Sequence, residues 1–243
     1  MNKPHYLDPL LRPASIAVVG ASEREGSVGR RTVENLLTGK YEGRLYTVNP
    51  GYSTVLGVPC FARLEDLPET VEHVVLTVGD ARIEAALDET IEHGATAATM
   101  MSSLFLEDDE EPLLRDRIEQ KIKTSGLVVC GANGMGFYNL ADGVWVCGFD
   151  TRDNHVRGGN VTLISHSGSG MSGILDCEER IDFNLAVSTG QELSVSMDQY
   201  LDFALEQPET RAVGLFMETA RKPKGMIEAF IKAQDKGIPV VVL

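Results

Sequence analysis

Short runs of apolar, often β-branched residues alternate with longer amphipathic segments along the 243-residue chain. In the first part, the apolar runs predict strands at residues 15–19, 45–48, 73–78, 96–101 and 127–130, and the 3.6-residue periodicity predicts helices at 27–37, 80–93 and 109–124. Apolar strands separated by helices of this length are typical of a parallel sheet that helices cover on both faces. We therefore predict an α/β fold.

The alternation stops between residues 140 and 159, where Gly, Asp, Asn and Arg follow one another without a helical period. It then resumes, with strands predicted at 161–164, 183–187, 212–216 and 238–243 and helices at 169–179, 194–206 and 224–236. We predict two α/β domains, at residues 1–145 and 159–243, joined by a β-rich linker at 146–158. Because the last apolar run has no helix after it, we expect the second domain to be truncated at its C-terminal end.

Composition and charge limit the classes of function. The chain has 22 Lys and Arg against 36 Asp and Glu, a net charge of −14, which argues against an extended nucleic-acid surface. The N-terminus lacks the apolar core of a signal peptide, and no apolar run reaches the ~18 residues of a membrane span. Four widely spaced cysteines and scattered histidines indicate reduced thiols and no metal site. We expect a cytoplasmic protein that binds neither nucleic acid nor membrane.

The first glycine-rich turn, residues 20–29, lies between the first predicted strand and its helix. Glycines there allow the backbone to approach a pyrophosphate, and the N-terminus of the helix directs N–H groups at the anion. The spacing differs from G-x-G-x-x-G because Ser22 stands at the second glycine. An NAD site also needs a carboxylate after the second strand, where this chain has Asn49 and Pro50. A nicotinamide-dependent oxidoreductase is therefore disfavoured, while a purely structural turn stays open.

Two further turns and one acid lie at strand ends. Residues 131–136 contain three glycines and Asn133, and could approach a ligand or form a simple exit from the sheet. Residues 165–170 (SHSGSG) form an anion site before a helix, and without G-x-S-x-G no hydrolytic triad is expected. His166 is expected to contact phosphate or to lie exposed. Glu218 follows a strand, where α/β sheets bind ligands, and the acidic run 107–111 is expected to begin a helix.

Taken together, these segments resemble the NDP-forming acyl-CoA synthetases, which include ADP-forming acetyl-CoA synthetase and the succinyl-CoA synthetase α subunit. The resemblance rests on LLRPASIAVVGASEREGSVG, YTVNPGY, LGVPCFARLEDLPE, CGANGMG, GGNVTLISHSGSGMSGILD, VSTGQELSV and QPETRAVGLFMET, in this order. It implies a Rossmann-like CoA-binding domain followed by a flavodoxin-like succinyl-CoA-ligase domain. It also implies a ligase that joins a carboxylate to CoA at the expense of ATP, through an acyl phosphate and a phosphohistidine.

The resemblance assigns roles to individual positions. The CoA phosphates would lie against Gly20, Ser22, Arg24, Gly26, Ser27, Val28 and Gly29, the adenosine against Asn49, Pro50 and Tyr52, and the pantetheine along Val78, Ser102 and Ser103. Asn133 would lie where the thiol meets the acyl group. Ser167, Gly168 and Ser169 would receive the phosphate of the phosphohistidine, and Glu218 would contact that histidine.

Some positions depart from the family pattern. Ala132 and Gly134 stand where Pro and Cys are usual, and His166 where Arg or Gln is usual. The phosphorylated histidine and the ATP-grasp part would lie outside this chain, so ATP and Mg²⁺ would bind there, on another domain or on a partner subunit of a homo- or hetero-oligomer. The chain alone would bind CoA without completing turnover. A regulatory acyl-CoA-sensing module of an acetyltransferase-like protein is the alternative.

Overall fold

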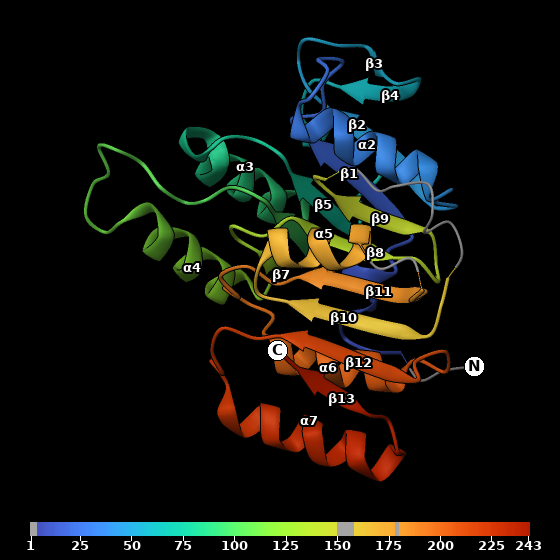
Figure 1. Ribbon diagram of the computed structural model, residues 1–243. Coiled ribbons are helices and arrows are strands. Elements are labelled where there is room, and N and C mark those ends of the chain that lie inside the picture. Colours follow the sequence, from blue (N-terminus) through green and yellow to red (C-terminus); the bar gives the residue numbers. More distant parts are fainter. Residues whose placement is uncertain (1–3, 150–157, 178–179) are drawn as a thin grey trace.

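The computed structural model describes residues 4–149, 158–177 and 180–243, which form two mostly parallel β-sheets. The strands are ordered β3-β4-β2-β1-β5-β6-β7 in the first sheet and β13-β12-β10-β11-β8-β9 in the second (Figure 1). The predicted α/β class is therefore confirmed. In the described part of the chain, no helix is long and apolar enough to cross a membrane.

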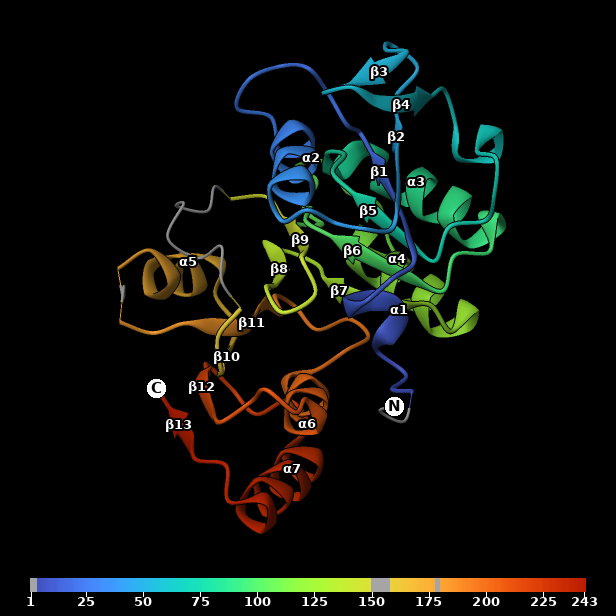
Figure 2. The same ribbon diagram turned by 90° about the vertical axis from the view of Figure 1, so that its right-hand side faces the viewer.

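The first sheet is built from the first half of the chain. Its strands are β1 (Ser15–Val19), β2 (Arg44–Val48), β3 (Thr54–Val55), β4 (Val58–Phe61), β5 (His73–Leu76), β6 (Ala97–Met100) and β7 (Val128–Gly131). All its pairs are parallel except β3 with β4. Helix α2 (Val28–Thr38) covers one face, while α3 (Asp80–His93) and α4 (Leu114–Ser125) cover the other (Figure 2). The short helix α1 (Asp8–Leu11) and the 3₁₀ turn η1 (Leu64–Asp66) complete this half.

The second sheet combines parallel strands with an antiparallel hairpin. Strands β10 (Val161–Ser165), β11 (Phe183–Ser188), β12 (Ala212–Phe216) and β13 (Val240–Val242) are parallel. The hairpin of β8 (Gly136–Asn139) and β9 (Val144–Cys147) adds to β11. Helix α5 (Gly168–Cys177) lies on one face, and α6 (Met197–Glu206) lies on the other with α7 (Pro223–Lys236) packed against it (Figure 2).

The hairpin lies across the predicted division of the chain. No strand is predicted at β8, because these four residues directly follow the glycine-rich turn and lack an alternating pattern. Phe137 pairs with Val187 of β11, so this segment belongs to the second sheet by pairing although it precedes residue 145. Residues 150–157 of the predicted linker and 178–179 of the predicted helix lie outside the described residues. The domain boundaries stay a prediction.

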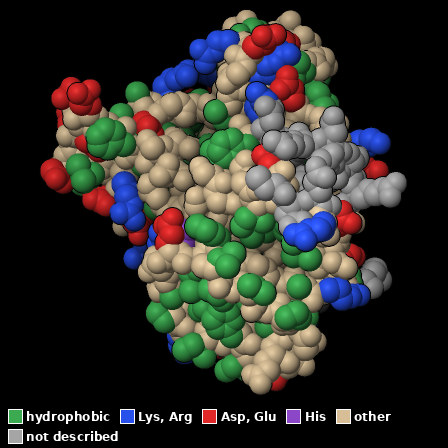
Figure 3. Space-filling model, in the orientation of Figure 1, with side chains coloured by type: hydrophobic (Ala, Val, Ile, Leu, Met, Phe, Trp, Pro, Cys, Tyr) green, Lys and Arg blue, Asp and Glu red, His purple; other side chains and the backbone are tan. Residues whose placement is uncertain are grey.

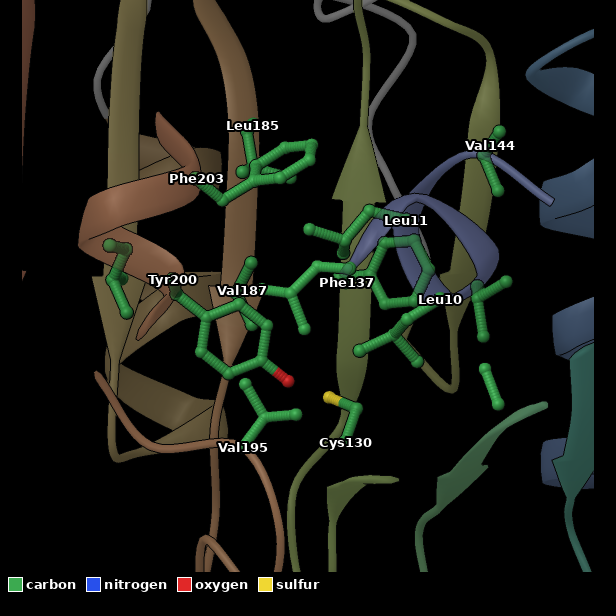
Figure 4. Packing of buried hydrophobic residues seen from close by; sticks show 14 of the residues in the cluster. Leu10, Leu11, Cys130, Phe137, Val144, Leu185, Val187, Val195, Tyr200 and Phe203 are labelled. Atoms are coloured by element: carbon green, nitrogen blue, oxygen red, sulfur yellow. The ribbon is translucent and has the colours of Figure 1, made fainter. Parts of the chain in front are cut away.

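One hydrophobic core connects the two sheets. Ile16 and Val18 of the first sheet belong to the same buried cluster as Leu185 and Val187 of the second. Figure 4 shows Leu10 and Leu11 of α1 beside Phe137, with Tyr200 and Phe203 of α6 approaching from the other side. The two halves are therefore packed as one body around the hairpin.

Helix α4 begins later than predicted. It begins at Leu114 rather than at Asp109, so the acidic run lies in the preceding loop. Asp109 Oδ2 nevertheless accepts the Leu114 N–H at 2.7 Å, and Asp109 Oδ1 pairs with Arg117 at 3.3 Å. The backbone hydrogen bond from Leu114 and the charge of Arg117 hold the pKa of Asp109 below its usual value. The carboxylate thus binds the first turn of the helix from outside it.

Candidate functional site

The first glycine-rich turn brings helix α2 directly against the end of β1. Gly20 has φ +87°, and a Cβ added at Gly29 would lie 2.3 Å from the Gly20 carbonyl oxygen. Only glycine allows this approach. Ser27 caps the helix, since its Oγ accepts the Arg30 N–H at 3.3 Å. The remaining N–H groups of the first turn have no partner within the helix and carry its partial positive charge.

A pocket of about 340 Å³ lies at the carboxyl ends of β1, β2 and β5, against α3. Four predicted residues line it together: Gly20, Asn49, Pro50 and Val78. Arg63 and Arg82 also line it, and they were not among the predicted residues. A second pocket of about 430 Å³ continues past Arg63 and Glu89 toward His93. This edge of the sheet therefore offers an elongated space in which Arg63 and Arg82 lie with Glu65, Glu89 and Glu92.

Asn49 fixes the turn instead of presenting a free polar group. Its Nδ2 donates to the Ala21 carbonyl at 2.7 Å, and its Oδ1 accepts the Gly51 N–H at 2.9 Å. Nearby, Ser22 Oγ lies 3.3 Å from the Tyr52 hydroxyl and accepts the Arg24 N–H at 3.0 Å. The structure thus brings the predicted phosphate and adenosine residues together.

The charges around this turn favour an anion. The Glu23 carboxylate is paired: its Oε2 lies 3.0 Å from Arg30 Nη1, and its Oε1 accepts the Leu56 N–H at 2.7 Å. Arg24 and Arg82 make no ion pair with any residue that the structure describes. Arg82 lines the pocket together with Glu89, while Arg24 lies in the turn that leads into the α2 N-terminus.

The second turn lies between the two sheets. Asn133 has φ +51° and donates its N–H to the Ser102 carbonyl at 2.8 Å. On its other side, the Ala132 carbonyl accepts the Gln191 N–H at 2.7 Å. Ser103 Oγ donates to Asp80 at 2.7 Å. The predicted residues Ser102, Ser103 and Asn133 are therefore neighbours, and Asn133 is exposed.

The third turn meets the other two. Ser167 caps α5, its Oγ accepting the Gly170 N–H at 3.1 Å, and a Cβ added at Gly168 would lie 2.5 Å from Met135 Cγ. A Cβ added at Gly148 would lie 2.9 Å from Met135 Cε and 3.1 Å from Val28 Cγ1. The first turn (Val28), the second (Met135) and the third (Gly168) thus lie against one another. The sequence predicts each turn but not their meeting.

His166 is neither exposed nor available to a phosphate, contrary to expectation. It is 5% exposed, its Nδ1 accepts the Glu218 N–H at 3.0 Å, and its Nε2 lies 3.0 Å from Glu192 Oε1. Glu192 also pairs with Arg221 at 3.2 Å. Glu218 itself is exposed at the end of β12, as expected from its place in the sequence. No role was predicted for Glu192, although it lies in the VSTGQELSV segment, or for Arg221, because only the tertiary fold brings these two side chains together.

Two protein families match the chain. Residues 14–139 match the family described as CoA binding domain, and residues 158–243 match the succinyl-CoA ligase like flavodoxin domain. The first match covers the sheet edge and pocket described above, and the second covers α5 and the loop that carries Glu218.

The chain is similar to several CoA ligases. It is 27% identical over 243 residues to a trans-feruloyl-CoA synthase from an unknown prokaryotic organism. This match covers 98% of this chain and 34% of that protein. It is 27% identical to the ADP-forming acetate–CoA ligase II of Archaeoglobus fulgidus, over 97% of this chain and 35% of that protein. The chain thus spans about a third of the length of these relatives.

A solved structure supports the same assignment. The acetyl-coenzyme A synthetase 1 of Candidatus Korarchaeum cryptofilum, solved with phosphate and ADP, is 25% identical and superposes with a TM-score of 0.85 over 100% of this chain and 52% of that chain. These three similar proteins are synthases or ligases, so they support neither the sensing module nor the oxidoreductase. The chain therefore belongs to the CoA binding domain family and corresponds to the N-terminal part of the ADP-forming acyl-CoA synthetases.

Proposed function

We propose that this chain binds CoA and supplies the acyl-transfer region of an NDP-forming acyl-CoA synthetase. The observation that carries the proposal is the pocket at the edge of the first sheet, which collects the predicted Gly20, Asn49, Pro50 and Val78. From there the predicted residues continue to the junction of the three turns, where the first and second domains meet.

The residues of the chain fit such a ligand. A Cβ at Gly20 would lie 2.9 Å from Val78 Cγ1, so only glycine lets the turn pack this closely against a residue that lines the pocket. The α2 N-terminus, Arg24 and Arg82 would hold the phosphates by dipole and charge. Asn49, Pro50 and Tyr52 would adjoin the adenosine, and Val78, Ser102 and Ser103 would guide the pantetheine toward Asn133.

The third turn would serve the phosphoryl step. Ser167, Gly168 and Ser169 at the α5 N-terminus would hold the phosphate of a phosphohistidine, and Glu218 would contact its imidazole. The histidine, ATP and Mg²⁺ would come from an ATP-grasp domain or subunit, which would supply the phosphoryl group. The chain covers 34% and 35% of the two similar ligases and 52% of the solved synthetase, which supports such a further part.

Exposed apolar side chains give the partner a surface. Val241 of β13 is 58% exposed and Leu243, which follows this strand, is 69% exposed. Figure 3 shows hydrophobic side chains gathered over this lower region of the face. Patches of this kind mark contact surfaces.

We place the protein in the cytoplasm, which the free thiols Cys60, Cys130 and Cys147 support.

The experiment is a calorimetric titration of CoA into three charge-matched variants. Arg24→Glu and Arg82→Glu should each weaken CoA binding by about tenfold or more, because each replaces a cation beside the phosphates with an anion. Arg115→Glu makes the same change of net charge on the exposed surface of α4 and should leave affinity within about twofold. Equal affinities in all three variants would contradict the assignment of the pocket.

A further inference from the structure

A carboxylate outside the predicted sites is buried where the loops of the second sheet meet. Glu192, on the loop between β11 and α6, has a side chain only 1% exposed. Its Oε1 lies 3.0 Å from His166 Nε2 and accepts the Met197 N–H at 2.9 Å, while its Oε2 lies 3.2 Å from Arg221. Such a buried charge is tolerated only when it is paired and hydrogen-bonded.

The surroundings keep Glu192 ionised. Burial by itself would raise the pKa of its carboxyl, but the hydrogen bond from His166 and the charge of Arg221 outweigh burial, so this pKa lies below its usual value. The N–H of Met197, in the first turn of α6, donates a further hydrogen bond to the carboxylate and also favours its ionised form.

The contacts of His166 determine its tautomer. The backbone N–H of Glu218 can only donate, so the Nδ1 that it meets at 3.0 Å must be the unprotonated nitrogen. The proton is then on Nε2 and is donated to Glu192. An arginine at position 166 has no acceptor and could not bind the Glu218 N–H in this way.

The backbone on either side of Glu192 reaches the second turn. Gln191 donates its N–H to the Ala132 carbonyl at 2.7 Å, and Leu193 donates to the Gly131 carbonyl at 3.0 Å. Glu192 is therefore bonded through its side chain to the third turn, to the loop that carries Glu218 and to α6. Its two neighbours in the chain are bonded to the turn that carries Asn133.

We propose that Glu192 is a positioning residue: through His166 it fixes the backbone of Glu218 relative to the turn that carries Asn133. This role rests on the proposed function, in which the thiol lies at Asn133 and the phosphohistidine at Glu218. An acyl group passing between these two points requires their separation to be held constant, because small displacements of reacting groups are costly.

The test is nuclear magnetic resonance of the protein labelled with ¹⁵N, including the histidine rings. In the unchanged protein, His166 should carry its proton on Nε2, and the Glu218 amide should exchange slowly with solvent. Glu192→Gln keeps an oxygen acceptor and should preserve both signatures. Glu192→Ala should speed exchange of the Glu218 amide by about tenfold or more. Glu84→Ala, which removes a carboxylate 3.0 Å from Arg117 between α3 and α4, is the control and should change neither.

Three results would overturn the proposal. They are a proton on Nδ1 of His166, an unchanged Glu218 amide in Glu192→Ala, or an equally fast exchange in Glu192→Gln and Glu192→Ala. The tautomer of His166 is measured in the unchanged protein, so this measurement tests the proposal even if Glu192→Ala does not fold. A parallel CoA titration of the unchanged protein tests the proposed function separately. If CoA did not bind, the proposed function would fail, while the His166 ring and Glu218 amide signals would still report on the role of Glu192.

Discussion

His73 is the first residue of β5, an interior strand of the first sheet, and it is buried where an ionisable side chain is rare. It is fully buried, its Nε2 lies 2.9 Å from Thr99 Oγ1, and its ring stacks on Phe137 with centroids 6.0 Å apart. Burial lowers the pKa of His73 from 6.5 to about 3, because the charged ring would lose its hydration. The ring is therefore neutral in the folded protein at neutral pH.

This burial makes stability depend on pH. Below pH 6.5 the unfolded chain binds a proton at His73 that the folded chain refuses until about pH 3, so the folded state loses stability as the pH falls through this range. His73→Gln removes the titrating group. The loss of unfolding free energy between pH 7.5 and 5 should therefore be about 2 kcal/mol smaller in this variant. Urea unfolding of both proteins at several pH values measures the difference, and parallel curves would show that His73 does not contribute.

Among the elements, α2 is the one whose position determines the first site. Gly29 lies in its first turn against the Gly20 carbonyl, so any side chain there would push the helix N-terminus away from the pocket. The glycine-rich turn is thus a packing requirement as well as a phosphate site.

Replacing this glycine should affect binding more than a comparable replacement elsewhere. Gly29→Ala should weaken CoA binding at least about tenfold and lower the free energy of unfolding by about 1–3 kcal/mol, because the clash is with backbone. Gly173→Ala, in α5, meets nothing within 4 Å and should raise stability by up to about 1 kcal/mol. Thermal unfolding and CoA calorimetry on the pair check this. If Gly29→Ala matched Gly173→Ala in both measurements, the packing argument would be wrong.

Prediction from the sequence succeeds for elements with a strong local pattern. Strands β1 and β5 and helix α3 lie where the apolar runs and the periodicity place them, and Gly94 ends α3 in the left-handed conformation. Strand β8 has only four residues, and its position depends on pairing with β11, which no local pattern records. Helix α4 begins after the acidic run because Asp109 caps it from the loop.

The candidate site divides in the same way. Glycine-rich turns at strand ends are visible in the sequence, and Gly20, Asn49 and Val78 do line one pocket. Arg82 could have been suspected, because it lies in the first turn of a helix that follows a strand. The Glu192–His166 contact joins residues 26 apart through two different strand ends, and only the tertiary fold brings them together.

For the whole molecule, the core around the hairpin joins the two sheets. Phe137 is fully buried and belongs to the cluster that contains Val75 of the first sheet and Val213 of the second. The two halves therefore share this cluster, although each also has a smaller cluster of its own, around Ile83 in the first half and around Met171 in the second.

Loss of this core should weaken both halves together. Phe137→Ala should lower the free energy of unfolding by about 3–5 kcal/mol. In the unchanged protein, the fluorescence of Trp145, the only tryptophan, and the far-ultraviolet circular dichroism should follow one transition. Two separated transitions would show that the sheets fold independently.

The most direct test of the central claim is a calorimetric titration of the chain with CoA and, separately, with NADH. The pocket is lined by Arg63, Arg82 and the glycine-rich turn, with Glu89 also in its lining. Asn49 follows the second strand, and its side-chain amide is hydrogen-bonded to Ala21 and Gly51. A dinucleotide ribose thus finds no carboxylate at the end of β2. We predict binding of CoA in the micromolar range and little binding of NADH. Tight binding of NADH with no binding of CoA would contradict the account.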